Sequence, residues 1–454
     1  MNSIGIIGGG ISGLTTAFGL EQNGVPFTLY EASPRVGGPV QSISRDGYIA
    51  ECGPNTLLET SPAITALITD LGLNNRKIFA SDQAKNRYIV KGQKPVALPT
   101  SPPAFLTSPL FSFGAKLRLL REPFISRYSG TKEESVADFV RRRLGNEFLD
   151  YAIDPFVSGV YAGDPEKLSF EYAVAKLYAL EQKYGSLIKG QIKGKRERSK
   201  SGEVAKDRAK MFSFDDGLQV LIDGLYDKLQ QDIKLHTSVS RIEHTSGGWN
   251  VHYNDKGTEY IKTHTSLIIT IPAYKLAELQ HNIEGVDLTP LQKIYYPPVT
   301  SIALGFKRSD VEHPLDGFGM LIPKVEHFHI LGTLFSSSLF PRRAPKDHVL
   351  LTTYIGGARQ PEIGAANENE QIELVMKDLR TLLVVRGNPT FINRTIYQKA
   401  IPQYDLGYGK YKQIMDDFEA KAPGLHIAGN FRTGISLSDC ITNGTKLAEQ
   451  IATK

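Results

Sequence analysis

The 454-residue chain has little cysteine and no long apolar run, and each shortage narrows what the protein can be. Its two cysteines, Cys52 and Cys440, lie far apart and have no metal-ligand spacing. Such sparse use is typical of a reducing compartment and argues against a disulfide framework. No apolar run reaches the roughly 18 residues that would span a bilayer. We therefore expect a protein that is soluble, or that lies on a membrane without crossing it.

We also expect no secretory or transit peptide, because an apolar strand is expected from residue 4 onward. The length suggests two or three domains, and a composition of 41% hydrophobic and 22% charged residues is typical of folded protein. The formal charge of +5 is concentrated between Lys189 and Lys210, where nine basic residues accompany three acidic ones. A solvated flexible loop is the simplest interpretation of this segment, and contact with anionic lipid headgroups is the alternative. Nucleic acid is rejected as a partner because no aromatic residues interleave the basic ones.

The first residues carry the pattern of a dinucleotide-binding fold. An apolar strand at 4–7 leads into a glycine-rich turn, and a helical pattern follows through Leu20. In this G-x-G-x-x-G spacing the glycines allow a tight turn, close approach of a pyrophosphate, and close packing of helix on strand. The amides of the first helical turn then point to the phosphates. The expected contacts in this turn are Gly8, Gly10, Ile11, Ser12 and Gly13.

A second strand, at 27–30, ends at Glu31, whose carboxylate is placed to accept hydrogen bonds from the adenosine ribose. A glycine pair, Gly37 and Gly38, follows closely and resembles the second fingerprint of the flavin amine oxidase superfamily. Pro39 stands where that superfamily often has Arg or Lys, which removes a side-chain contact and a backbone donor. No second G-x-G-x-x-G follows, so the expected cofactor is FAD and a separate nicotinamide domain is not expected.

The far C-terminus is expected to complete the cofactor site. Residues 425–428 are predicted as a short strand, Gly429 and Asn430 as a turn, and 437–452 as a helix. Gly434, Ile435 and Ser436 would then begin that helix and direct amide groups at the cofactor. An ordinary strand-helix closure of the sheet is the alternative, and the N-terminal pattern favours a shared cofactor site.

The middle of the chain divides into two kinds of segment. Residues 234–271 show short alternating strands with turn signals, which predicts a β-meander. Helical patterns at 135–149 and 170–182 predict a mostly helical domain inserted between pieces of the flavin domain. Before them, 99–125 mixes apolar residues with cations, and two interpretations stay open for it. Its apolar residues are either ordinary core or an interfacial surface whose cations meet lipid headgroups.

Several longer motifs narrow the resemblance. They are FVSGVYAGDPEKLS from Phe156, LEQKYGSLIKG from Leu180, GFGMLIP from Gly317, LGTLFSS from Leu331, FPRRAP from Phe340 and GNFRTG from Gly429. On these motifs the chain resembles the protoporphyrinogen oxidase family along nearly its whole length. The Gly-Pro-Asn-Thr run at 53–56 is most similar to the plant-like branch of that family.

The resemblance implies an α/β fold, α+β overall, with three parts. The expected parts are a Rossmann-like FAD-binding domain with a β-meander (1–80, 205–282 and 395–454), a substrate domain with a mixed β-sheet (81–95 and 283–394), and an inserted helical, membrane-binding domain (96–204). The flavin contacts that it implies outside the first glycine turn are Glu31, Ala32, Gly37, Gly38, Pro39, Val40, Gly53, Pro54, Asn55, Thr56, Val239, Gly429, Asn430, Gly434, Ile435 and Ser436.

The reaction implied by the resemblance is the six-electron oxidation of protoporphyrinogen IX to protoporphyrin IX in haem biosynthesis, with oxygen or another acceptor taking the electrons. This substrate is a flexible apolar macrocycle with two propionates, so its site needs apolar walls and a cation. Flavin N5 would accept the hydride, and no general base is assigned. The residues that match the family's substrate positions are Arg87 for a propionate, Leu321 and Leu334 for the pyrrole rings, Tyr354 for stacking, the Gly159 carbonyl for pyrrole N–H groups, and Asn55 beside the flavin.

Three other functions stay in view. A coproporphyrinogen III oxidase would need more cations for four propionates. A general amine oxidase usually has a flavin-facing lysine at about the level of 299–306, and this stretch has none. The third alternative is a porphyrin-carrying flavoprotein without turnover. No metal is predicted, because the pair His327 and His329 has no evident third ligand.

The expected partners follow from the same resemblance. They are the porphyrinogen, an electron acceptor and a membrane surface, with a homodimer and hand-over of product to ferrochelatase as further hypotheses. The expected location is the cytoplasm, peripheral on the inner face of the cell membrane.

Overall fold

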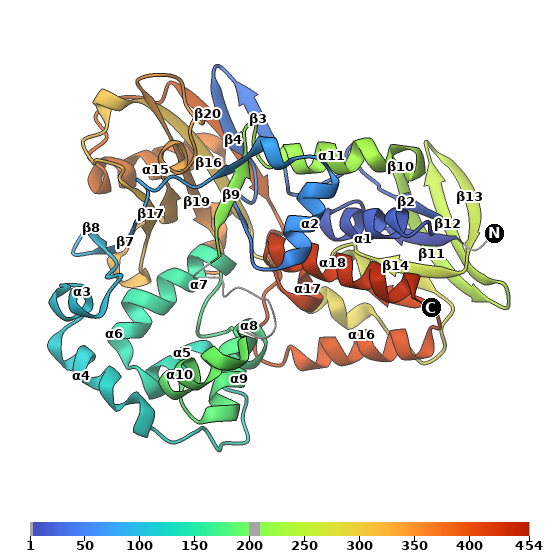
Figure 1. The fold of residues 1–454 in the computed structure, drawn as a ribbon, viewed down its shortest axis with the longest axis horizontal. Coiled ribbons are helices and arrows are strands. Elements are labelled where there is room, and N and C mark those ends of the chain that lie inside the picture. Colours follow the sequence, from blue (N-terminus) through green and yellow to red (C-terminus); the bar gives the residue numbers. More distant parts are fainter. Residues whose placement is uncertain (1–2, 199–208, 454) are drawn as a thin grey trace.

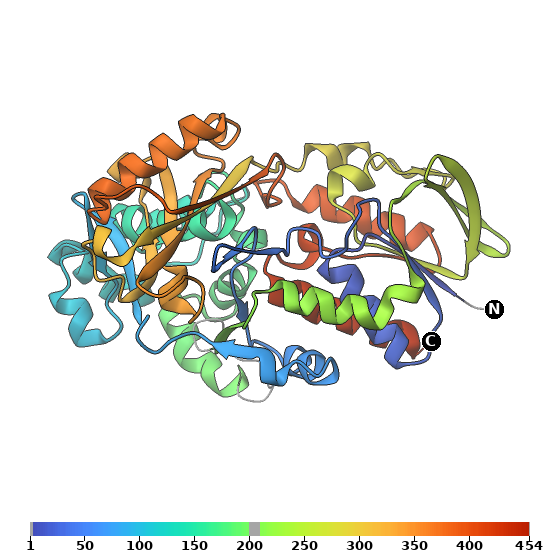
Figure 2. The same ribbon diagram turned by 90° about the horizontal axis from the view of Figure 1, so that it is seen from above.

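The computed structural model describes residues 3–198 and 209–453. Figure 1 shows a unit containing both chain ends on one side of the molecule, a second sheet on the other side, and a cluster of helices next to that sheet. The view from above keeps the two sheet-containing units side by side along the long axis (Figure 2). Among the described residues, no helix has both the length and the apolar character that crossing a membrane requires.

The unit with the chain ends is built on a five-stranded parallel sheet. Its order is β10 (Ile233–Lys234), β2 (Phe27–Tyr30), β1 (Ile4–Ile7), β14 (Ser266–Ile269) and β21 (Leu425–Ile427). The central strands are buried along their whole length, as parallel strands covered on both faces are. Helices α1 (Ile11–Gln22), α11 (Gln219–Leu229) and α18 (Leu437–Ala452) share one core with this sheet. The predicted N-terminal strands and C-terminal helix are thus confirmed, whereas the predicted turn at Asn430 is the start of a short helix, α17 (Asn430–Thr433).

The β-meander covers the other face of the sheet. It consists of β11 (Thr237–Thr245), β12 (Gly248–Asp255) and β13 (Thr258–His264), with β15 (Gln280–His281) at its edge. Trp249 and Val251 of β12 lie in one core with Leu267 and Ile269 of β14. This arrangement confirms the meander predicted from alternating residues.

Helices α1 and α18 touch at a glycine, which brings the two chain ends together. A Cβ at Gly444 would lie 2.2 Å from the Thr15 hydroxyl and 2.9 Å from the Ser12 carbonyl oxygen, so a larger residue has no room. The Thr16 hydroxyl donates to the Gly444 carbonyl at 3.2 Å. This contact fixes the C-terminal helix beside the first glycine turn.

The second sheet has seven mixed strands. Its order is β20 (Phe391–Tyr397), β16 (Val299–Lys307), β19 (His348–Gly356), β18 (Ile330–Leu334), β17 (Gly317–Leu321), β7 (Asn86–Lys91) and β8 (Lys94–Ala97). Helix α15 (Glu368–Leu382) packs its apolar residues against one face, where Val375 and Leu379 share a core with Ile302 and Met320. Part of the opposite face packs on β4 (Tyr48–Glu51), where Tyr48 and Ala50 share a small core with Leu350.

The helical cluster runs from α3 (Pro102–Thr107) to α10 (Leu187–Arg198). A fully buried guanidinium, Arg143, holds it together by bonding the carboxylates of Glu122 and Glu181. In the segment 99–125, Phe111 belongs to the core whereas Phe124 is exposed, and contact of this segment with lipid stays a prediction. The basic segment begins as helix α10 and not as the predicted loop, and its residues 199–208 lie outside the described residues.

A buried histidine at the end of β13 predicts acid sensitivity. His264 bonds the Tyr30 hydroxyl at 2.8 Å, and burial, assisted by nearby Lys262, lowers the pKa of this histidine to about 4. Between pH 6.5 and 4 the unfolded chain therefore binds a proton that the folded chain refuses, so stability falls as the pH falls. We expect this histidine to make the free energy of unfolding about 2 kcal/mol lower at pH 5 than at pH 7. The free energy of unfolding of His264→Gln, measured by thermal unfolding, should fall less between pH 7 and pH 5 than that of the unmodified protein. An equal fall in both proteins would contradict the prediction.

Candidate functional site

The first glycine turn leaves open space where a pyrophosphate would lie. Gly8 has φ +111°, and a Cβ at Gly13 would lie 2.0 Å from the Gly8 carbonyl oxygen, so both positions require glycine. A Cβ at Gly10 would meet nothing within 4 Å. Gly10 is also the N-cap of α1 and supplies no side chain to its first amides. The helix start is therefore ready to bind an anion.

The second glycine pair lies directly beside this turn. The Gly37 amide donates to the Gly9 carbonyl at 2.8 Å, and Gly10 forms an isolated bridge with Gly37. Both Gly37 and Gly38 have positive φ, and a Cβ at Gly38 would approach only the Gly10 Cα, at 3.6 Å. The two predicted fingerprints thus form one backbone-lined surface.

Glu31 marks the ribose end of that surface. One of its carboxylate oxygens accepts from the Gly9 amide at 2.7 Å and the other from the Ser33 amide at 2.8 Å. These bonds fix the carboxylate while leaving each oxygen a lone pair for a sugar hydroxyl. The amide of Thr237 donates to the Glu31 carbonyl, which brings the start of β11 and the predicted contact Val239 to the same end. Ala32 follows Glu31 and is exposed there.

The loop at 53–56 and the C-terminal segment close the other end. A Cβ at Gly53 would lie 2.3 Å from the Pro39 carbonyl oxygen, so this loop touches the segment Pro39–Val40. Beyond Pro54, Asn55 and Thr56, the Leu58 carbonyl accepts from Ser438 in the first turn of α18 at 2.9 Å. The structure therefore gathers the cofactor residues predicted from distant parts of the chain into one region.

Tyr404 supports the C-terminal segment, and the sequence analysis did not single it out. Its hydroxyl donates to the Asn430 carbonyl and accepts from the Gly434 amide at 3.1 Å. Burial raises the pKa of Tyr404 well above its usual value, so the hydroxyl keeps its proton. Nothing in the local pattern distinguishes this tyrosine from the nineteen others in the chain.

The predicted substrate residues lie on one face of the seven-stranded sheet. One row of residues paired across neighbouring strands consists of Leu321, Gly332 and Tyr354. A second row, two residues farther along each strand, consists of Arg87, Gly319, Leu334 and Thr352. Because residues two apart on a strand point to the same face, both rows face away from the α15 core. The glycines between these residues are closely packed, since a Cβ at Gly319 would lie 2.3 Å from the Thr333 carbonyl oxygen and one at Gly332 would lie 2.8 Å from the Met320 carbonyl oxygen. The cross-strand pairing thus brings together four residues spread over more than 260 positions.

Helix α7 (Asp154–Tyr161) brings the remaining substrate residue to this face. A Cβ at Gly159 would lie 2.4 Å from a Leu321 methyl carbon, so the helix contacts the sheet there. The start of α7 is held by Arg359, which bonds the Asp154 carboxylate and donates to the Asp154 and Ile322 carbonyls at 3.0 and 2.9 Å. Asp154 and Arg359 are a buried pair that the sequence analysis missed, because their partnership depends on packing across about 200 residues.

The cofactor region and the substrate face meet at one hydrogen-bonded pair. The Asn55 amide nitrogen donates to the Tyr354 hydroxyl and, at 3.0 Å, to the Gly53 carbonyl. Burial raises the pKa of Tyr354, so it stays protonated over the physiological range. The loop that follows the glycine fingerprints is thereby attached to the sheet that carries the predicted substrate residues.

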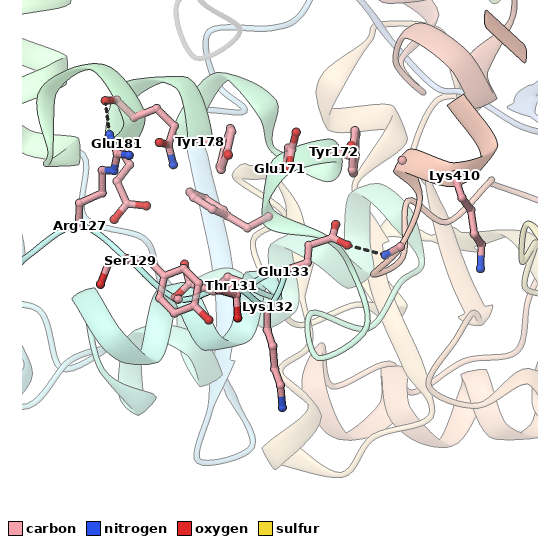
Figure 3. Close-up of a pocket in the computed structure, with 17 residues that line it drawn as sticks. Arg127, Ser129, Thr131, Lys132, Glu133, Glu171, Tyr172, Tyr178, Glu181 and Lys410 are labelled. Carbon is pink, nitrogen blue, oxygen red and sulfur yellow. Dashed lines mark hydrogen bonds between the residues drawn. The ribbon is translucent and has the colours of Figure 1, made fainter. Parts of the chain in front are cut away.

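A cavity of about 680 Å³ lies elsewhere, between the helical cluster and the start of α16 (Gly409–Lys421). Figure 3 shows its wall, with Tyr172 and Tyr178 among the side chains of the cluster and Lys410 on the far side. None of the predicted flavin or substrate residues lines it. His329 also lies away from the candidate site, bonded to the Asp378 carboxylate at 3.1 Å, and no cluster of three metal-ligating residues occurs in the described part of the chain.

Comparison with known proteins agrees with the dinucleotide-binding geometry of this site. Residues 11–452 match the family described as flavin containing amine oxidoreductase. The chain belongs to this family.

Curated relatives match over nearly the whole chain. Protoporphyrinogen oxidase 2, chloroplastic/mitochondrial, of Arabidopsis thaliana is 36% identical, covering 99% of this chain and 93% of the relative. Coproporphyrinogen III oxidase of Bacillus subtilis (strain 168) is 30% identical, covering 97% of this chain and 95% of the relative. A crystal structure of a protein from Exiguobacterium sp. 255-15 matches with a TM-score of 0.82 and 22% identity over 100% of this chain and 99% of that one. The last likeness shows the fold alone.

FAD is the cofactor of this enzyme, and the residues present fit it. The open space above Gly10, the uncapped start of α1 and the fixed Glu31 carboxylate suit a pyrophosphate and a ribose. The start of α18 suits an electron-rich oxygen of the cofactor, because a helix carries positive dipole charge at its N-terminus. The site thus combines a dinucleotide cradle with an adjoining sheet face that carries the predicted substrate residues.

Proposed function

We propose that this enzyme oxidises protoporphyrinogen IX to protoporphyrin IX in haem biosynthesis, by removing six electrons. The observation that carries the proposal is one face of the seven-stranded sheet, where Leu321, Leu334 and Tyr354 lie with a single predicted cation, Arg87. The match to a protoporphyrinogen oxidase over 99% of the chain supports it. When bound, FAD supplies a two-electron acceptor for hydride taken from the macrocycle.

Each wall residue has a distinct part in this proposal. Leu321 and Leu334 contact the pyrrole rings and exclude water, and Tyr354 stacks on a ring while its hydroxyl keeps its bond to Asn55. Gly159 lies in the last turn of α7, where helix carbonyls lack a donor from a following turn, so its carbonyl is available to pyrrole N–H groups. No general base is required of the protein, since positioning supplies the main contribution.

Arg87 is proposed to bind a propionate. Its side chain is exposed, its guanidinium lies 5.7 Å from the Phe318 ring centre, and it forms no ion pair in the described part of the chain. An arginine with free donors suits a carboxylate at the edge of an apolar ligand.

A coproporphyrinogen III oxidase is the second candidate, because the Bacillus subtilis relative also matches over 97% of the chain. Its four carboxylates would need more cations than the predicted substrate residues offer. Assays with both porphyrinogens distinguish the two candidate functions. Faster turnover of the tetracarboxylate would contradict the proposal and favour coproporphyrinogen III oxidation.

The remaining assignments are part of the same proposal. We assign 1–80, 205–282 and 395–454 to FAD binding, 81–95 and 283–394 to substrate binding, and 96–204 to the helical part. Oxygen is the proposed electron acceptor, with a homodimer and hand-over to ferrochelatase as proposed assembly and partner. The proposed location is the cytoplasmic face of the cell membrane.

Peripheral binding to that membrane is proposed for an apolar stripe on α4 (Phe113–Arg121) and the turn after it. Phe113, Leu117, Leu120 and Phe124 recur at helical spacing, and all are exposed, the two phenylalanines by 82% and 85%. The opposite stripe of the same segment, with Ala115 and Glu122, is buried. An outward apolar stripe flanked by Arg121 and Lys189 suits an anionic bilayer surface.

Replacing the stripe should release the protein from vesicles. We expect Phe113→Ser, Leu120→Ser and Phe124→Ser together to weaken binding to anionic vesicles by more than about 100-fold, since each lost side chain removes about 1.5–3 kcal/mol of burial. Co-sedimentation at low salt measures this. Tyr260→Ser with Ile261→Ser, on exposed β13, is the matched control and should bind normally. Equal binding of the stripe variant and the unmodified protein would refute the membrane proposal.

A further inference from the structure

A buried guanidinium lies beneath the loop that carries Asn55. Arg343 is 2% exposed. Its Nη2 donates to the Ser213 hydroxyl at 2.7 Å and lies 3.3 Å from a Glu51 carboxylate oxygen. Its Nη1 has no hydrogen-bond partner among the described residues. Buried charged donors rarely go without an acceptor, so this nitrogen indicates a missing partner.

A small cavity adjoins this guanidinium. It has a volume of about 10 Å³, close to the space that one water molecule needs. Its lining residues are Ile49, Glu51, Asn55, Ser336, Leu339, Phe340 and Arg343. Four of these side chains are polar, which supplies the partners that a buried water requires.

The chemistry of the wall favours water over an anion. The Glu51 carboxyl borders the cavity, and its oxygens accept from the Ser42 hydroxyl at 2.6 Å and the Leu218 amide at 3.0 Å. Burial raises the pKa of Glu51 to about 7 although Arg343 opposes the rise. An anion here would be repelled by the Glu51 carboxyl whenever that group is ionised, whereas water can accept from Arg343 and still donate.

We propose that one ordered water fills this cavity and links the free Nη1 of Arg343 to Asn55, making Arg343 and Glu51 positioning residues for the Asn55–Tyr354 pair. Asn55 already uses its amide N–H groups on Tyr354 and Gly53, so the water supplies a donor to its carbonyl oxygen. The amide is then held from both sides where the cofactor region meets the substrate face. The kinetic consequence rests on the proposed porphyrinogen oxidation, whereas the water itself does not.

The water can be tested without turnover. A crystal structure of the FAD-bound protein at a resolution that shows ordered solvent should contain a peak within hydrogen-bonding distance of both Arg343 Nη1 and Asn55. A clear map without that peak would overturn the proposal, whatever the enzyme's substrate.

Kinetics test the positioning role. Arg343→Lys keeps the charge but loses the Nη1 donor, and we expect kcat per bound flavin to fall about tenfold, the effect of one weakened bond in the transition state, with KM within about twofold. Arg342→Lys, the exposed neighbour, should leave both constants unchanged. Glu51→Gln provides a second variant if the lysine variant does not fold, and its kcat should fall in the same way. Reduced flavin content or stability with unchanged kcat per bound flavin in both variants would overturn the positioning role.

Discussion

Purified Gly10→Val should be colourless, because its side chain enters the space that the FAD pyrophosphate needs. Gly10 has ordinary extended backbone angles, and a Cβ there meets no protein atom within 4 Å, so we expect the chain to fold with the larger residue. Losing two charge-assisted amide bonds at about 1.5–3 kcal/mol each should lower FAD affinity by roughly 100-fold or more. Flavin absorbance after gel filtration and calorimetric titration with FAD measure the loss.

The control is a second glycine in the same turn. Gly13→Ala would place a Cβ 2.0 Å from the Gly8 carbonyl oxygen, so it should impair folding as well as FAD binding. Gly10→Val should instead match FAD-stripped unmodified protein in circular dichroism and unfolding temperature. Normal flavin content in Gly10→Val would contradict the placement of the pyrophosphate.

Arg87→Ala should have the next largest effect, which is a loss of kcat/KM for the substrate. Removing a charge-assisted bond to a propionate costs about 1.5–3 kcal/mol, which lowers kcat/KM for protoporphyrinogen IX by roughly 10- to 150-fold. Flavin content and stability should not change, since Arg87 is exposed and lies outside the buried core. Initial rates of porphyrin fluorescence over a range of substrate concentrations measure the effect.

Lys85→Ala is the matched control for this variant. Lys85 is an exposed cation two residues earlier, and its ammonium lies 3.9 Å from the exposed Asp82 carboxylate. Its replacement should leave kcat/KM unchanged. If both variants had the same kcat/KM as the unmodified enzyme, Arg87 would have no part in binding the substrate.

The sequence predicted those parts of the fold whose signals are local. The apolar strands at 4–7 and 27–30 and the helix at 437–452 have the predicted bounds, because period, glycine spacing and a strand-ending acid suffice to locate them. The basic segment was predicted wrongly at its start, since charge density alone does not distinguish a loop from α10. The meeting of the two chain ends depends on Gly444, which the pattern marks only as a small residue in a helix.

The supports of the site could not be predicted in this way. Tyr404, Arg359 and Arg343 contact groups 26, 205 and 292 residues away, at Asn430, Asp154 and Glu51. No periodicity or spacing connects such pairs, because tertiary packing alone brings them together. The strand register that places Arg87 and Leu334 in one row likewise becomes visible only once the sheet order is known.

The most direct test of the proposed function is porphyrin formation by the purified, FAD-bound enzyme in air. Porphyrin fluorescence would be followed with protoporphyrinogen IX and with coproporphyrinogen III, each against its autoxidation without enzyme. We predict a flavin spectrum and fast formation of protoporphyrin IX, with the tetracarboxylate substrate turned over more slowly. Bound flavin with neither porphyrin forming above the autoxidation rate would contradict the proposed function while leaving the fold and the cofactor site in place.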